Sequence, residues 1–191
     1  MVKVSAIVLG GGLSRRMGEE NKLFLPIKGK PMIGWVIEQV KASNASDVVL
    51  VGSALSTEKL REFVDVRIGV VDNPDYKTGM TSSIQAGVQA ARGDGYMICL
   101  GDQPNIRTDT YDQLIDVFEN TPNSIVLPYY QGTKGNPVIF PKAYREEILK
   151  HPHPEGCKEL IQENWQQVVK VEVHDTGVLL DVDTPSDYEQ L

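Results

Sequence analysis

Three glycines directly follow a short apolar run near the start of the chain, and positively charged side chains come soon after them. Residues 6–9 are apolar, residues 10–12 are glycines, and Arg15, Arg16 and Lys22 add fixed positive charge. Glycine lets another group approach the backbone closely, and successive free N–H groups in such a turn form a concave anion site. These residue types at this spacing predict a site for a triphosphate.

Two other phosphate motifs do not fit this stretch. A P-loop requires a lysine directly after its last glycine, but Gly18 is followed by Glu19. A dinucleotide fingerprint requires a third glycine at the position of Arg15. The alternative interpretation is an ordinary turn from a strand to a helix, with solvated arginines.

Asp102 is the carboxylate best placed to bind a metal ion. It follows an apolar run over residues 96–100 and Gly101, and Pro104 comes two residues later. Mg²⁺ prefers one or two carboxylates together with phosphate oxygens and waters. Asp102 is therefore a candidate Mg²⁺ ligand that faces the triphosphate, although aspartate also commonly caps a turn.

A second metal ligand is expected near the end of the chain. Asp181 and Asp183 are two residues apart, so in an extended segment they face the same way. Asp183 is favoured because Thr184 and Pro185 begin a helix and fix it at a turn. An N-terminal helix cap is the competing role for Asp183.

Three polar residues are candidates for contacts with the base and ribose. Ser82 and Ser83 stand at a predicted helix N-terminus after Gly79, and Asn73 follows a strand-like run over residues 68–71. Hydroxyls and free N–H groups at a helix N-terminus suit a ribose, a base edge or a phosphate. Ordinary capping is the alternative. Lys22 is expected to stabilise the charge that develops on a phosphate during transfer.

The elements that must position these residues alternate between strands and helices. Strand-like runs cover residues 48–51, 68–71 and 96–100, and helical spacing covers residues 33–40 and 84–91. This alternation predicts an α/β fold with a mostly parallel, doubly wound sheet, and mixed strand directions in the less regular second half. In such sheets ligands bind at the edge where the strands end.

Length and composition narrow the class of protein. The chain has 191 residues, which suits a single domain over residues 1–191, and 41% of them are hydrophobic. The net charge of −7 argues against a nucleic-acid partner. Two cysteines outside any Cys-x-x-Cys pair, no signal peptide and no membrane-spanning run predict a cytoplasmic protein without a membrane partner.

Residues 9–18 with Lys22, together with the Gly-Asp-Gln-Pro stretch at residues 101–104, resemble the nucleotidyltransferases that activate molybdenum cofactor. The resemblance implies a three-layer Rossmann-like nucleotidyltransferase fold. It also implies catalytic roles for Lys22, Arg15 and Asp102, with Asp102 and Asp183 holding Mg²⁺. The nucleotide-binding residues that it implies are Leu9, Gly10, Gly11, Gly12, Ser14, Arg15, Arg16, Lys22, Asn73, Ser82 and Ser83.

Further stretches resemble the cytidylyltransferase branch of this family more than the guanylyltransferase branch. The resemblance implies CTP and a molybdopterin-type acceptor as substrates, Gly135, Asn136 and Lys158 as acceptor-binding residues, and a xanthine-dehydrogenase-type enzyme as a partner. The chain departs from the branch at residues 153–158, where Lys158 replaces an arginine and an aspartate is missing.

Three alternatives to this assignment remain open from the sequence. The enzyme could transfer GMP to the same cofactor. It could instead transfer CMP to a sugar phosphate or a methylerythritol-type phosphate. The third alternative is a carrier without catalytic activity that brings the cofactor to its partner enzyme.

Overall fold

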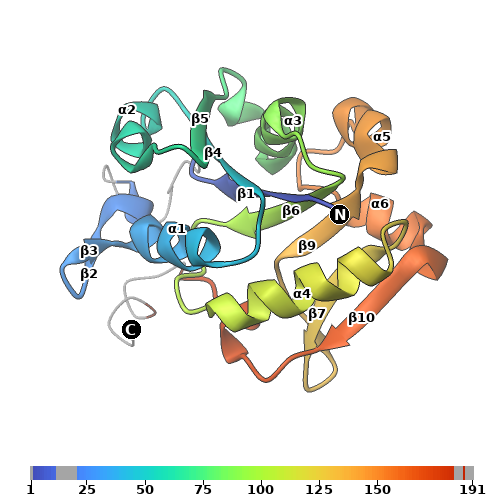
Figure 1. The fold of residues 1–191 in the computed structure, drawn as a ribbon. Helices are drawn as coiled ribbons and strands as arrows, with labels where there is room; N and C mark the ends of the chain where they lie inside the picture. Colours follow the sequence, from blue (N-terminus) through green and yellow to red (C-terminus); the bar gives the residue numbers. More distant parts are fainter. Residues whose placement is uncertain (1, 12–20, 183–186, 188–191) are drawn as a thin grey trace.

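The computed structural model describes residues 2–11, 21–182 and 187, and within them eight strands form one twisted sheet between two layers of helices (Figure 1). The strand order is β10-β7-β9-β6-β1-β4-β5, with β8 paired to β7. The strands are β1 (Val4–Leu9), β4 (Asp47–Gly52), β5 (Ile68–Asp72), β6 (Gly95–Leu100), β7 (Ile125–Tyr130), β8 (Thr133–Lys134), β9 (Val138–Pro141) and β10 (Val168–Glu172). A separate small hairpin pairs β2 (Pro26–Ile27) with β3 (Lys30–Pro31).

Strand direction changes between the two halves of the chain, as the sequence predicts. Strands β6, β1, β4 and β5 are all parallel. Strand β9 is antiparallel to both of its neighbours, β6 and β7. Because β9 reverses the direction, its beginning lies at the same edge of the sheet as the ends of β1 and β6.

The position of strand β1 inside the sheet explains its continuously apolar sequence. All six of its residues are buried, because helices cover both faces of the sheet. Ala6 and Val8 belong to one apolar cluster of the core, and Ile7 and Leu9 belong to the other. Neighbouring residues of the strand therefore face opposite helical layers.

The helices divide between these two clusters. Helices α1 (Met32–Ala42), α2 (Thr57–Leu60) and α4 (Thr108–Asn120) contribute to the cluster of Ala6 and Val8. Helices α3 (Met80–Ala90), α5 (Arg145–Lys150) and α6 (Lys158–Glu163) contribute to the cluster of Ile7 and Leu9. The predicted α/β architecture with three layers is confirmed.

The helical spacing over residues 33–40 corresponds to α1, whose residues at that spacing, Ile33, Val36, Ile37 and Val40, are all buried. Within the ranges that the structure describes, no helix combines the length and the apolar character needed to cross a membrane.

Candidate active site

The ends of three parallel strands bring the predicted nucleotide and metal residues to one edge of the sheet. The backbone N–H of Gly10, just after β1, donates to the carbonyl of Val51 at 2.8 Å. The N–H of Asn73, just after β5, donates to the carbonyl of Gly52 at 3.0 Å. Asp102 follows the end of β6, the other neighbour of β1. The glycine segment, Asn73 and Asp102 therefore share this edge.

Close packing explains two of the glycines at this edge. A Cβ atom on Gly10 would lie 3.0 Å from side-chain carbons of both Ile33 and Leu60. A Cβ atom on Gly101 would clash with the carbonyl oxygen of Leu9. The predicted residues Gly12, Ser14, Arg15 and Arg16 lie outside the residues that the structure describes.

Lys22 and Asp102 form an ion pair across this edge. Lys22 Nζ lies 2.9 Å from Asp102 Oδ2 and 2.8 Å from the carbonyl oxygen of Val182, to which it donates. The N–H of Val182 in turn donates to the backbone carbonyl of Asp102 at 3.0 Å. Only 11% of the Lys22 side chain and 23% of the Asp102 side chain are exposed. Three segments that are distant in sequence thus meet around one lysine.

Local backbone structure holds Lys22 in this position. Lys22 begins a short 3₁₀ helix over Lys22–Phe24, and the side chain of Asn21 caps it by accepting from the N–H of Leu23 at 3.2 Å. Such a cap satisfies a donor that a helix start leaves without an intrahelical partner. The lysine that the sequence singles out is therefore presented from a short, capped turn.

The carboxylate of Asp102 fits a metal ion that a nucleotide would help to bind. Among the described residues, no three His, Cys, Asp or Glu side chains gather as a set of ligands. Mg²⁺ needs only one or two carboxylates when phosphate oxygens and waters complete its coordination. Asp183, the predicted second ligand, lies outside the described residues. Asp181, its alternative, lines a neighbouring cavity.

Asn73, Ser82 and Ser83 form one hydrogen-bonded cluster. The amide nitrogen of Asn73 donates to Ser82 Oγ at 2.9 Å and to Ser83 Oγ at 3.0 Å. Its amide oxygen accepts from the N–H of Asp75 at 3.0 Å. Asn73 is 2% exposed. The cluster therefore ties the loop after β5 to the first turn of α3, and Ser82 is its more accessible member.

A cavity of about 270 Å³ lies beside Asp102, and the predicted acceptor residues Gly135, Asn136 and Lys158 all line it. Leu100, the last residue of β6 before the Gly101–Asp102 turn, forms part of its wall. Most of the other lining side chains are apolar: Met80, Ile84, Ile98, Leu127, Val138, Phe140 and Ile161. The arrangement suits a ligand with a ring or hydrocarbon body and a polar end near the Gly101–Asp102 turn.

Lys134 lines the same cavity and was missed by the sequence analysis. Partial burial at the cavity opening, together with the nearby positive charge of Lys158, lowers the pKa of Lys134 from its usual value. Its position directly before Gly135 and Asn136 was the signal that could have revealed it. A basic residue adjoining an expected acceptor segment is a natural candidate for contact with an anion.

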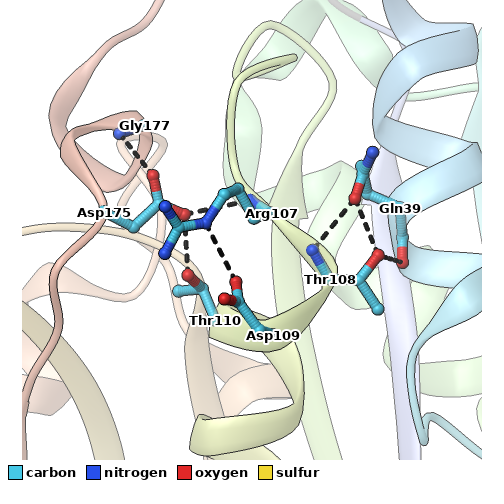
Figure 2. A network of polar contacts seen from close by, with 7 residues as sticks. All are labelled: Gln39, Arg107, Thr108, Asp109, Thr110, Asp175 and Gly177. Carbon is cyan, nitrogen blue, oxygen red and sulfur yellow. Dashed lines mark hydrogen bonds and ion pairs between the residues drawn. The ribbon is translucent and has the colours of Figure 1, made fainter.

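The carboxylate of Asp175 lies at the centre of a polar network that links α4 to the segment after β10 (Figure 2). It accepts from the N–H of Arg107 at 2.9 Å, the hydroxyl of Thr110 at 2.7 Å and the N–H of Gly177 at 2.9 Å. These bonds join the start of α4 to the 3₁₀ helix over Thr176–Leu179.

That 3₁₀ helix supports the acceptor segment directly. The carbonyl of Val178 accepts from the N–H of Asn136 at 3.0 Å and lies 3.4 Å from the side-chain nitrogen of Gln103. On the other side of α4, the hydroxyl of Thr108 donates to the side chain of Gln39 at 2.7 Å (Figure 2). Asp175 thus joins the start of α4 to the 3₁₀ helix whose Val178 carbonyl holds Asn136, and no motif in the sequence marked it.

Residues 6–169 match the family described as the MobA-like NTP transferase domain. The molybdenum cofactor cytidylyltransferase of Escherichia coli is 24% identical over 98% of this chain and 95% of its own. The purine catabolism protein PucB of Bacillus subtilis is 29% identical over 97% of this chain and 94% of its own. A probable molybdenum cofactor guanylyltransferase of Bacillus cereus is 30% identical over 70% of this chain and 66% of its own.

Solved structures share the fold at lower identity. Rv0371c of Mycobacterium tuberculosis has a TM-score of 0.83 at 22% identity over 99% of this chain and 97% of its own. A structure of the same protein in complex with manganese has a TM-score of 0.78 at 23% identity over the same shares of both chains. A 4-diphosphocytidyl-2C-methyl-D-erythritol synthase from Anaerococcus prevotii has a TM-score of 0.79 at 14% identity, over 99% of this chain and 94% of its own.

Proposed function

This chain belongs to the MobA-like NTP transferase family, and we propose that it transfers CMP from CTP to the phosphate of molybdopterin. The reaction releases pyrophosphate and requires Mg²⁺. The observation that carries the proposal is the meeting of Lys22 and Asp102 at the end of β6, beside a largely apolar cavity.

The reaction needs positioning and charge stabilisation more than acid–base chemistry. A phosphate oxygen of the acceptor attacks the α-phosphorus of CTP in line with the departing pyrophosphate. Lys22 stabilises the negative charge that develops on the α-phosphate. The glycine segment, with Arg15 and Arg16, holds the β- and γ-phosphates.

Asp102, with Asp183, would hold the Mg²⁺ ion. The bound ion would neutralise phosphate charge during the transfer. The structure of a relative in complex with manganese supports a divalent cation in this family's fold. Ser82 contacts the base or ribose, and Asn73 positions Ser82 through its amide.

The walls of the cavity favour a ring-bearing acceptor over a sugar phosphate. Eight of the lining side chains named above are hydrocarbon, thioether or aromatic groups, which bind planar rings better than they bind hydroxyl-rich sugars. The Escherichia coli relative named for molybdenum cofactor supports the same acceptor. The relative named for purine catabolism is consistent with delivery of the product to a xanthine-dehydrogenase-type enzyme.

GMP transfer to the same acceptor is the second candidate, and the Bacillus cereus relative favours it. Thermal unfolding with Mg²⁺ and each of CTP, GTP, UTP and ATP separates the two. A nucleotide at about 100 times its dissociation constant adds roughly 2.7 kcal/mol of stability. We expect a large shift with CTP alone. A shift with GTP alone would move the assignment to guanylyl transfer.

The same thermal unfolding measurement also distinguishes the enzyme from a carrier without catalytic activity. A carrier binds the finished cofactor but gains no stability from a free nucleoside triphosphate with Mg²⁺. A protein that no triphosphate stabilises, and that releases no pyrophosphate in the presence of molybdopterin, would contradict the enzymatic proposal.

A further inference from the structure

Two lysines from separate parts of the chain share the mouth of the cavity beside Asp102. Lys134 ends the short strand β8, and Lys158 begins α6, 24 residues later in the sequence. Both line the cavity and both are exposed to solvent, so they lie at its opening. The two positive charges therefore face the same space.

Neither ammonium group has a hydrogen-bonding or ion-pairing partner in the part of the chain that the structure describes. Glu155 and Asp181 also line the cavity, but neither is bonded to Lys134 or Lys158. Several other lysines do have an acidic partner: Lys22 with Asp102, Lys30 with Glu38, Lys41 with Asp65, and Lys150 with Glu146. Lys134 and Lys158 therefore lack the acidic partner that balances the positive charge of those other lysines.

Two like charges beside a low-dielectric cavity are unfavourable until an anion joins them. The lowered pKa of Lys134, which burial and Lys158 cause, reflects this cost. The protein as a whole carries a net charge of −7, and at this opening neither lysine is bonded to the two acidic residues, Glu155 and Asp181, that line the same cavity. A bound anion would remove the repulsion.

The walls of the cavity indicate which chemical group the bound anion is attached to. Phe140, Ile84 and Ile161 present apolar surface, which suits a ring system. Asn136 and Leu100 line the end of the cavity that adjoins the Gly101–Asp102 turn. The site thus combines an apolar body, two lysines at its opening and a wall residue, Leu100, that lies next to the Gly101–Asp102 turn.

We propose that Lys134 and Lys158 bind the phosphate monoester of a ring-bearing acceptor, and that Lys134 selects phosphorylated over unphosphorylated acceptors. Two ammonium groups match the two negative charges of a phosphate monoester. They also reduce its repulsion from the triphosphate that it must approach. The assignment of this ligand as the acceptor rests on the proposed function, whereas the binding of the phosphate does not.

Pyridoxal 5′-phosphate tests the site without any need for nucleotidyl transfer, because it carries a planar ring, a phosphate monoester and an aldehyde. The aldehyde condenses with an unprotonated lysine amine to give an imine and water. Borohydride then reduces the imine to a stable secondary amine, which peptide mass spectrometry locates. The reaction is run with CTP and Mg²⁺ present, so that the reagent is kept from the expected triphosphate site.

We expect Lys134 or Lys158 to be modified at about tenfold lower reagent concentration than exposed Lys28 and Lys142, since one charge-assisted contact contributes about that factor. Pyridoxal, which lacks the phosphate, loses the preference, and excess inorganic phosphate suppresses it. Modification spread evenly over exposed lysines, or an equal preference with pyridoxal, overturns the inference.

A substitution provides the second test. Lys134→Met is expected to raise the KM for a phosphorylated acceptor about 10- to 100-fold and to leave the Kd for CTP unchanged. Lys134→Arg is expected to recover part of the loss. The matched control is Lys142→Met, which removes one positive charge from an exposed position outside the cavity. An unchanged acceptor KM in Lys134→Met contradicts the selective role of Lys134.

The two proposals fail in different ways. If Lys134 or Lys158 is modified selectively but the protein transfers no CMP, the phosphate site is supported and the proposed reaction is rejected. If the protein transfers CMP but its lysines are modified unselectively, the proposed reaction is supported and the phosphate site at Lys134 and Lys158 is rejected.

Discussion

The ammonium group of Lys22 lies 2.9 Å from Oδ2 of Asp102, although 80 residues separate the two in sequence. One residue is the predicted phosphate-binding lysine, and the other is the predicted metal ligand. In this structure each neutralises the other at the end of β6. Binding of a metal ion and a triphosphate would offer each of them a new partner of the opposite charge.

Asp102→Asn removes the carboxylate charge but keeps the shape of the side chain and an oxygen that can accept from Lys22. We expect CMP transfer to fall by at least about 100-fold, because electrostatic stabilisation at a reacting phosphate contributes that much or more. The melting temperature should change by only a few degrees. The control is Asp116→Asn, which neutralises an exposed aspartate on α4. Full transfer activity in Asp102→Asn would reject Asp102 as a metal ligand.

Lys22→Met should have opposite effects on metal binding and on catalysis. Removal of the ammonium that is paired with Asp102 frees this carboxylate for a cation. We therefore expect the affinity for Mn²⁺ without nucleotide to rise about five- to tenfold, measured by electron paramagnetic resonance of free Mn²⁺. The rate of transfer should fall, since the charge on the α-phosphate loses its stabiliser. Unchanged Mn²⁺ affinity together with normal turnover would refute both roles.

Asp175→Ala should destabilise the whole fold. Asp175 is 5% exposed, and its carboxylate accepts from Arg107, Thr110 and Gly177, so its removal leaves buried donors without a partner. We expect a loss of about 2–4 kcal/mol in the free energy of unfolding, measured in urea. Asp175→Asn should lose less because it keeps one acceptor oxygen. A loss below about 0.5 kcal/mol in Asp175→Ala would show that the network in Figure 2 does not hold α4 in place.

Lys134→Met should stabilise the free protein at neutral pH even though it weakens acceptor binding. The lowered pKa of Lys134 means that folding disfavours its charged form, so the charge costs stability below the folded-state pKa. As pH rises from the folded-state value to the ordinary lysine value, the unfolded state holds more protons and the wild type gains stability. The difference in melting temperature between variant and wild type should therefore be largest at neutral pH and should shrink in alkali. A variant less stable than the wild type at pH 7 contradicts this account.

Site residues that follow the ends of strands could be predicted from the sequence. Lys22 and Asp102 could be placed together because parallel neighbouring strands end at the same edge, and the structure brings them into contact. The mixed second half was also predictable, because its hydrophobic pattern is less regular. Arg15, Arg16 and Asp183 stay predictions, since they lie outside the described residues.

Residues that act through distant contacts are hard to predict from sequence, and for Lys134 the one signal was its position before Gly135 and Asn136. Lys134 gains its importance from Lys158 across a cavity, and Asp175 gains its importance from Arg107 and Thr110 on another element. Neither belongs to a local motif. Asn73 was proposed for its contact with a ligand, whereas its amide is engaged with Ser82 and Ser83 inside the protein. Periodicity reveals which face of an element is buried, but it does not reveal which distant side chain will meet it.

The most direct test of the central claim is the transfer of labelled CMP from α-labelled CTP to molybdopterin, with pyrophosphate counted in the same reaction. We expect one pyrophosphate released for each CMP transferred, a strict need for Mg²⁺ or Mn²⁺, and loss of both products in Asp102→Asn. Pyrophosphate and labelled product formed equally well without a divalent cation, or by Asp102→Asn, would contradict it. So would a wild-type protein that binds molybdopterin and CTP together and forms neither product.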